Sequence, residues 1–228
     1  VRRFDPDEFV QGNGTLVLVS KEGEGSGGAL VAALVRAVCK AAEQCARANG
    51  GRLAVPLVIE LDECANIVRW PELPSLYSFY GSLGIVVTSY FQSRAQGSNA
   101  FGESGMKTLW DSAGIRIYGG GSGDEAWLRE LSSLIGEYDA QTHSKSYGRG
   151  GSTRSTQTQR RARLDVASLA KLPEWQAVVF SGKANPTIMQ LVPWWRDKGL
   201  ASRIEHEVED EHEVEDDHEV EDDHEARS

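Results

Sequence analysis

The stretch LVIELDE at residues 57–63 decides how this chain folds. After Pro56 it opens with apolar residues, which predict a buried strand, and it ends in two adjacent carboxylates, Asp62 and Glu63. Acidic residues at the carboxyl end of a strand lie where open α/β sheets bind their ligands. The stretch therefore predicts a ligand site at the end of a sheet strand, although Glu60 is unusual for a strand buried on both faces.

Apolar runs of strand type alternate with helical periodicity on both sides of this stretch. We expect further strands at residues 14–20, 85–91 and 115–118, and helices at residues 30–48, 76–80, 103–113 and 124–138. The connections between them are short. This order predicts an α/β fold with a mostly parallel sheet and helices on both of its faces.

Composition divides the chain into four parts. Residues 1–140 are expected to form the α/β core, and residues 141–163, rich in Ser, Thr, Gly, Gln and Arg, a mobile linker or long loop. Residues 164–198 return to globular character and predict a helix and two strands that complete the domain. Residues 199–228 end in a six-residue His/Glu/Asp repeat that is expected to be disordered, because it cannot bury enough apolar area to fold.

Charge is distributed unevenly along the chain. The formal net charge is −10, but residues 204–228 hold fourteen acids against Arg227 alone, so the remainder is mildly basic. The three cysteines show no CxxC spacing, which suits a reduced cytosolic compartment and argues against a zinc site or a disulfide framework. No apolar run approaches the ~20 residues that a membrane span needs. We therefore expect a cytoplasmic chain whose acidic tail docks a basic partner, or is merely solvated.

The acid pair has a catalytic and a simpler interpretation. In nucleoside triphosphatases this is the Walker B arrangement, in which the Asp helps to hold hydrated Mg²⁺ and the Glu polarises the attacking water. The simpler interpretation of Asp62 and Glu63 is a pair of solvated acids. Gln92 follows the expected strand 85–91, where its amide could contact a terminal phosphate, or it could simply cap the next segment.

Phosphate-binding signals are mixed. The Gly-rich loop at residues 23–28 follows an expected strand and opens a helix, but Ala29 and Leu30 stand where the GxxxxGK[ST] motif requires Lys and Ser or Thr, so no Walker A motif is present. Cations in residues 141–163 can neutralise phosphates without reading sequence. The candidate nucleic-acid residues are Arg149, Arg154, Arg160 and Arg161. A solubilising linker is the alternative.

Taken in order, these segments resemble the C-terminal part of a type IV secretion coupling protein. The resemblance is to conjugation ATPases of the TraG/TraD kind, in their actinobacterial branch, and to the region called the TraM-recognition domain. It covers roughly residues 4–197 and rests on LDECANI, LPSLYSFYGSLGI, SYFQSRAQGSNAFGESGMKTLW, LSSLIGEYD, AVVFSG and VPWW.

The resemblance implies a RecA-like P-loop NTPase fold and a set of residue roles. Such proteins are hexameric, membrane-anchored motors that bring a relaxase–DNA complex or protein substrates to the secretion channel at the cytoplasmic face of the membrane. Asp62 would be the Mg²⁺-side acid, Glu63 the water-activating Glu and Gln92 the phosphate sensor, with ATP and Mg²⁺ as cofactors. Arg94 and Arg116, near strand ends, are candidates for the Arg that reaches a neighbouring subunit.

The family's phosphate loop and membrane anchor lie upstream of the matching region, and this chain opens on Val1. The resemblance therefore implies half of a motor, from a truncated or split reading frame, which is expected not to turn over ATP without the P-loop half or full-length subunits. Two alternatives stay open. One is a non-catalytic adaptor that binds relaxosome proteins or secretion substrates, and the other is a metal-dependent nuclease, which would need further carboxylates or a Lys at the acid pair.

Overall fold

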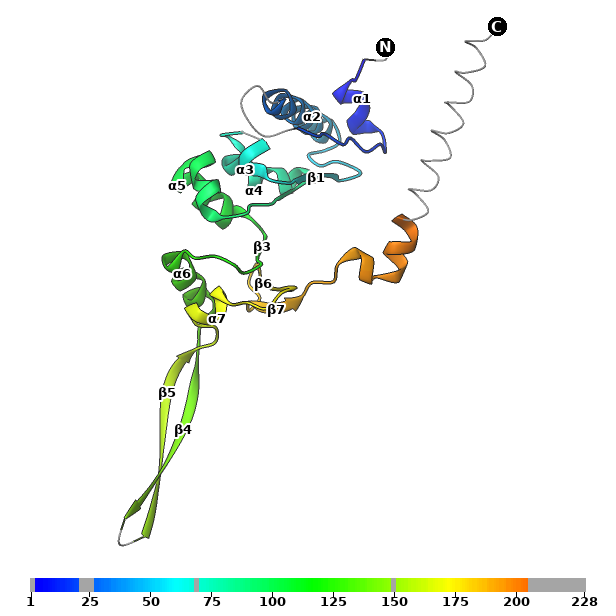
Figure 1. The fold of residues 1–228 in the computed structure, drawn as a ribbon. Helices are drawn as coiled ribbons and strands as arrows, with labels where there is room; N and C mark the ends of the chain where they lie inside the picture. The colour runs from blue at the N-terminus through cyan, green and yellow to red at the C-terminus, as the bar shows by residue number, and fades with distance from the viewer. Residues whose placement is uncertain (1–2, 21–26, 68–69, 149–150, 205–228) are drawn as a thin grey trace. The chain divides into compact units, whose positions relative to one another are not determined.

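The computed structural model describes residues 3–20, 27–67, 70–148 and 151–204 of the chain (Figure 1). It divides into two compact units, Val1–Arg116 and Ile117–Ser228. Among the residues described, no helix is both long and apolar enough to cross a bilayer.

The first unit alternates helices with two strands. Its elements are α1 (Pro6–Gln11), α2 (Gly28–Ala48), β1 (Leu57–Leu61), α3 (Cys64–Ile67), α4 (Leu73–Leu83), β2 (Ile85–Ser89) and α5 (Arg94–Ser112). The strands β1 and β2 pair in parallel, with Leu57 opposite Ile85 and Leu61 opposite Ser89. Parallel strands need a crossover connection, which α3 and α4 provide. The predicted α/β class is confirmed.

The core of the first unit lies on one face of this strand pair. Leu61 and Ile85 are buried together with residues of α2, α4 and α5, among them Cys39, Tyr80 and Leu109. Val58, on the opposite face of β1, is 61% exposed. Successive side chains in a strand point to opposite faces, so Glu60 shares the open face with Val58. This placement explains how an apolar strand accommodates a carboxylate.

Capping residues mark the helix boundaries more accurately than the boundaries predicted from the spacing of apolar residues. The helix predicted at 76–80 runs from Leu73 to Leu83 and ends at Gly84, whose φ of 84° is the left-handed conformation that glycine adopts without strain. The helix predicted at 103–113 is part of α5, which begins at Arg94 after the N-cap Ser93. Gly102 has non-helical angles inside α5, so the helical period reads continuously only after it.

The predicted strand at residues 14–20 is not formed. These residues have no strand pairing in the part of the chain that the structure describes, and Val17 and Val19 are 77% and 89% exposed. An apolar run becomes a strand only when another strand satisfies its backbone groups. No neighbour among the described residues does so.

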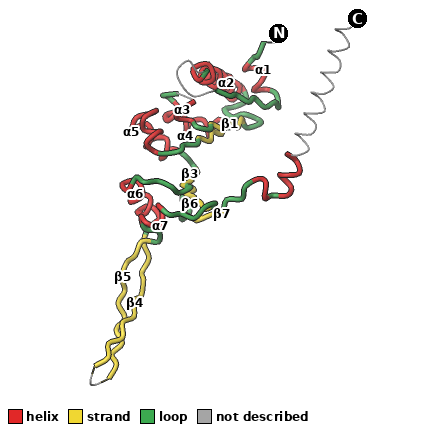
Figure 2. Tube along the Cα trace, viewed as in Figure 1, coloured by secondary structure: helices red, strands yellow, loops and turns green. Residues whose placement is uncertain are grey.

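The second unit has a small sheet and a long hairpin (Figure 2). Its elements are β3 (Ile115–Tyr118), α6 (Glu125–Ile135), β4 (Glu137–Gly148), β5 (Gly151–Ala162), α7 (Val166–Ala170), β6 (Gln176–Ser181), β7 (Thr187–Gln190) and a 3₁₀ turn (Trp194–Arg196). The sheet order is β3-β6-β7, with β6 and β7 antiparallel. The helix and two strands predicted within residues 164–198 are present.

A β-hairpin replaces the predicted linker at residues 141–163. The strands β4 and β5 are each twelve residues long and pair antiparallel, from Glu137 opposite Ala162 to Gly148 opposite Gly151. At its base, the Arg163 backbone N–H donates to the Gly136 carbonyl at 3.0 Å. The hairpin was missed because its sequence has almost no apolar alternation. We call β4 and β5 together the ribbon.

The last part of the chain is described only in part. Residues 198–204 are helical, although residues 199–228 were predicted to be disordered. The acidic repeat itself, residues 205–228, lies outside the described residues.

Candidate functional site

The carboxyl ends of β1 and β2 lie side by side in the first unit. Beyond the paired strands, the Tyr90 N–H donates to the Leu61 carbonyl at 3.0 Å, and the Cys64 N–H donates to the Tyr90 carbonyl at 3.1 Å. These two bonds carry the pairing one step past each strand. They bring the acid pair of one strand next to the residues that follow the other.

Asp62 and Glu63 form a tight turn between β1 and α3. Asp62 is exposed, and its Oδ1 accepts a hydrogen bond from the Glu63 backbone N–H at 3.0 Å. Glu63 is half-buried and has a φ of +46°, in the left-handed region that residues other than glycine rarely adopt. Strained backbone of this kind gathers at functional sites, where the surrounding structure holds it in place.

A chain of side-chain hydrogen bonds starts at Glu63. The Gln92 Nε2 donates to the Glu63 Oε1 at 2.7 Å, and the Gln96 Nε2 donates to the Gln92 Oε1 at 3.2 Å. The Gln96 backbone N–H in turn donates to the Oγ of Ser93, the N-cap of α5. The first turn of α5 therefore holds the Gln92 amide against the Glu63 carboxylate. Gln96 was missed from the sequence, although its spacing of four from Gln92 is the spacing at which helical side chains meet.

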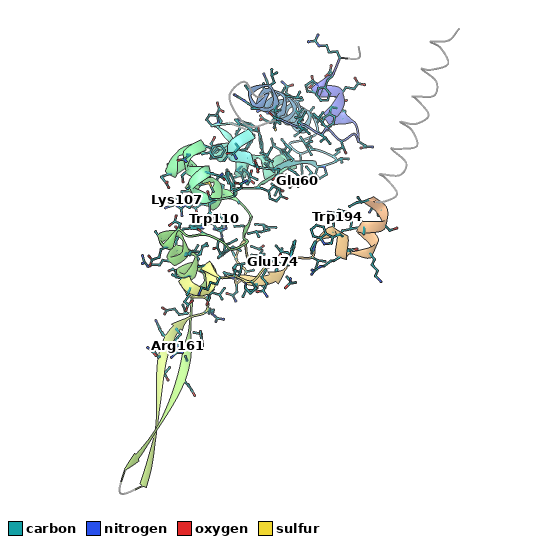
Figure 3. All side chains as sticks on the ribbon, viewed as in Figure 1. Glu60, Lys107, Trp110, Arg161, Glu174 and Trp194 are labelled. Carbon is teal, nitrogen blue, oxygen red and sulfur yellow. The ribbon has the colours of Figure 1, made fainter. Side chains whose placement is uncertain are left out.

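Glu60, which is labelled in Figure 3, is the centre of a second group of hydrogen bonds, on the open face of the strand pair. Its carboxylate accepts a hydrogen bond from the Thr88 hydroxyl at 3.1 Å and from the Tyr90 hydroxyl at 3.0 Å. The hydrogen bond to Glu60 raises the pKa of Tyr90, and partial burial and the charges of Glu60 and Asp62 add to this shift. Glu60, which is unusual for a buried strand, thus accepts two side-chain hydrogen bonds and lies two residues before Asp62.

Buried groups on the other face of the strands support the turn from below. Cys64 is fully buried, and burial raises the pKa of its thiol to about 11. The Tyr77 hydroxyl donates to the Val87 carbonyl at 2.8 Å, and burial raises its pKa as well. A protonated buried thiol is neither a nucleophile nor a metal ligand. Cys64 therefore packs beneath the site and supplies no chemistry to it.

The acid pair fits a magnesium ion that is bound mainly by water and phosphate. In the described part of the chain, no group of three or more His, Cys, Asp or Glu side chains could hold a metal by itself. Mg²⁺ does not need such a cage, because it keeps several waters and binds through one or two carboxylates together with substrate phosphates. The exposed Asp62 carboxylate can serve as that single protein ligand. A nuclease site with several converging carboxylates is not present in this part of the chain.

The other predicted residues belong to other elements of the chain. Arg94 is the first residue of α5, two residues after Gln92. The guanidinium of Arg116, in β3, lies 5.5 Å from the ring centroid of Trp110. The candidate nucleic-acid residues Arg154, Arg160 and Arg161 are in β5, and Arg149 lies outside the described residues.

Comparison with known proteins gives one family. Residues 56–174, just over half of the chain, match the family described as the TraM recognition site of TraD and TraG. No protein of curated function matches the chain.

Solved structures of the bacterial conjugative coupling protein TrwB share the fold. Its unbound form is 23% identical with a TM-score of 0.54, covering 73% of this chain and 39% of TrwB. The complex of TrwB with ADP and Mg²⁺ is 22% identical with a TM-score of 0.52, covering 73% and 38%. The complex with the non-hydrolysable GTP analogue GDPNP is 22% identical with a TM-score of 0.51, covering the same shares. This chain thus spans less than two fifths of the protein that it resembles, and the likeness supports the RecA-like fold predicted from the sequence.

Proposed function

The chain belongs to the family that carries the TraM recognition site of TraD and TraG, and on that premise we propose that it is the C-terminal portion of a conjugative coupling ATPase. Such a protein links a relaxase–DNA complex or a protein substrate to a type IV secretion channel, at the cytoplasmic face of the membrane and as a hexamer. The observation that carries this proposal is the 2.7 Å hydrogen bond from Gln92 to Glu63 across the ends of two parallel strands. It joins the two residue types that a nucleotide site needs at this position.

Each residue of the turn has one role in the proposed reaction. Mg²⁺–ATP, when bound, supplies the phosphate that is attacked and the metal that neutralises its charge. Asp62 holds the hydrated metal through its exposed carboxylate, and Glu63 orients and polarises the attacking water. Gln92 would contact the terminal phosphate through its side-chain amide, which donates to the Glu63 carboxylate in this structure.

The remaining parts of the site come from outside this chain. The sequence has no GxxxxGK[ST] motif, so the β- and γ-phosphates would be held by a P-loop segment or by full-length subunits of the ring. Arg94 is the better of the two candidates for an Arg that acts on a neighbouring subunit's nucleotide, because it follows Gln92 closely. Arg116 is the weaker one, since its guanidinium is already stacked on Trp110.

ATP hydrolysis by the 228-residue chain, alone and mixed with the P-loop segment of a coupling protein, tests the proposal. We expect hydrolysis only in the mixture, and we expect Glu63→Gln to abolish it while ATP still binds. Glu60→Gln is the matched control, because it removes a carboxylate three residues earlier that accepts hydrogen bonds from Thr88 and Tyr90 and has no role in the proposed reaction. Turnover retained by Glu63→Gln would overturn the role assigned to Glu63. Turnover by the chain alone would overturn the proposal that a separate P-loop segment must supply the phosphate-binding part of the site.

The second candidate function is a non-catalytic adaptor, favoured by Ala29 and Leu30 in the place of the phosphate-loop Lys and hydroxyl. In this case the chain binds relaxosome proteins or secretion substrates, and its acidic tail docks a basic partner. Binding of the partner should then survive Asp62→Ala, and it should weaken with salt and on truncation after Arg203. Binding that is indifferent to salt would argue against the adaptor.

A further inference from the structure

We propose that Gln96 is a positioning residue for Gln92. It turns the Gln92 side chain so that the amide nitrogen, and not the carbonyl oxygen, faces the place of the terminal phosphate. This inference deepens the proposed function and rests on it, because it concerns the phosphate contact assigned to Gln92. Two hydrogen bonds in series carry it. The Gln92 Nε2 donates to the Glu63 Oε1 at 2.7 Å, and the Gln96 Nε2 donates to the Gln92 Oε1 at 3.2 Å.

The chemistry of the three side chains fixes the direction of this series. A carboxylate accepts hydrogen bonds and cannot donate them, so Glu63 requires the NH₂ group of Gln92. The Gln92 carbonyl oxygen then points away from Glu63, where it needs a donor. The Gln96 amide supplies that donor, whereas a carboxylate at position 96 could not. A phosphate is an acceptor too, so the orientation that suits Glu63 also suits a terminal phosphate.

Gln92 does not select this orientation by itself. It is exposed, and the terminal torsion of a glutamine amide has two broad and nearly equivalent orientations. Glu63 selects one of them in this structure, but in the proposed reaction the Glu63 carboxylate serves the attacking water. Gln96, which is half-buried, is then the neighbour that keeps the amide turned the right way.

The start of α5 holds Gln96 where it can act. Residues 93–96 read Ser-Arg-Ala-Gln, the S-x-x-Q pattern of a capping box, in which the Ser side chain accepts from the N–H of the Gln. The Ser93 Oγ accepts this bond from the Gln96 N–H at 3.2 Å. In a capping box the Gln side chain reaches back towards the backbone of the Ser. Here its amide nitrogen donates to the side chain of Gln92, so a common helix start also orients a residue of the site.

Three substitutions separate the orientation of the amide from the stability of the helix. Gln96→Glu is isosteric but accepts from Gln92, so it turns the Gln92 carbonyl oxygen towards the site. Glu is favourable at this helix position, so the free energy of unfolding should be kept. Gln96→Met keeps the length of the side chain and removes its donor. Asn99→Asp is the matched control, because it adds the same charge at an exposed position three residues further along α5.

The first measurement is the Gln92 side-chain amide resonance, followed by heteronuclear NMR on the nitrogen-labelled 228-residue chain without nucleotide. In the unchanged chain, Glu63→Ala should shift this resonance, because it removes the acceptor of the amide. In Gln96→Glu and Gln96→Met the same substitution should shift it much less, because the amide no longer faces Glu63. An equal response to Glu63→Ala in all three chains would overturn the inference.

The second measurement is ATP hydrolysis by the chain mixed with the P-loop segment of a coupling protein. Loss of one ordinary hydrogen bond in Gln96→Met should lower kcat about 5-fold. Gln96→Glu removes the donor from the phosphate and should lower kcat about 100-fold, with KM for ATP little changed. The control Asn99→Asp should leave kcat close to that of the unchanged chain. In a chain that already carries Gln92→Met, Gln96→Glu should lower kcat no further, because it acts through Gln92.

The two measurements distinguish failure of this inference from failure of the proposed function. An equal loss of kcat from Gln96→Glu with and without Gln92 would overturn the positioning role, as would an equal loss in Asn99→Asp. An NMR response that depends on Gln96, together with hydrolysis that Glu63→Gln retains, would support the positioning of Gln92 and overturn the catalytic role of Glu63.

Discussion

Replacing Glu63 by glycine and by alanine measures the strain in the turn that carries the acid pair. Both substitutions remove the hydrogen bond from Gln92, so the difference between them reports the backbone at a φ of +46°. A left-handed conformation costs a residue with a Cβ about 1–2 kcal/mol, and the greater freedom of glycine in the unfolded chain offsets about 0.4–1 kcal/mol of that. We therefore expect Glu63→Gly to be more stable than Glu63→Ala by about 1 kcal/mol.

Urea denaturation followed by circular dichroism gives the two free energies of unfolding. Glu60 supplies the control, because it lies in β1 with ordinary strand backbone and its carboxylate likewise accepts side-chain hydrogen bonds. There the order should reverse, with Glu60→Gly less stable than Glu60→Ala by about 0.5–1 kcal/mol. Equal stability of the two variants at Glu63, or the same order at both positions, would refute the strain argument. Glycine at position 63 would relieve the strain. A strained Glu at this position is therefore expected if its side chain is needed for function.

Four further predictions concern other parts of the chain. A thiol reagent at neutral pH should modify the half-buried Cys45 and leave Cys64 protected; fast reaction of both would contradict the packing beneath the site. Burial raises the Cys64 pKa from 9.0 to about 11, so its contribution to stability should be fully present below pH 9 and lost as the pH rises through 11, measurable as a decline that Cys64→Ala lacks. Leu131→Ala, at a fully buried position of α6, should cost about 2–5 kcal/mol in denaturation experiments, and a smaller loss would mean that the site collapses around the cavity. Truncation after Arg203 should strengthen binding of a labelled single-stranded oligonucleotide in fluorescence anisotropy, because it removes an acidic tail that repels phosphate; weaker binding would show that the tail assists.

Local signals predicted the elements that are stabilised by their own sequence. Apolar periodicity predicted the strand at 57–61 and the helix that ends at Ala48. The N-cap Asp124 marks the start of α6, and its Oδ1 accepts a hydrogen bond from the Trp127 N–H at 3.0 Å. Predictions of strands were wrong where the outcome depends on a neighbouring strand. Residues 14–20 have strand composition without a strand beside them, and the ribbon has a strand partner without strand composition.

The candidate site was predictable in part for the same reason. Asp62, Glu63 and Gln92 were proposed because each follows an apolar run, and the structure joins Gln92 to Glu63 by a hydrogen bond, while their roles stay predictions. Gln96 was missed because its role depends on where α5 begins. The non-helical conformation of Gly102 interrupts the helical spacing of apolar residues, so the sequence did not show that the helix starts at Arg94. The conformation of Glu63 has no sequence signature at all, since nothing in its side chain favours a positive φ.

The one-sided burial of β1 and β2 fixes how these strands tolerate change. Val58 and Val86 are 61% and 46% exposed, whereas Leu61 and Ile85, at the alternate positions, are almost completely buried. A library of every substitution along either strand, selected for folded protein, should thus return polar residues at every second position only. This alternation would also separate two kinds of substitution. Those on the buried face would reduce folding, whereas those on the open face would be detected only by a change in activity or in partner binding.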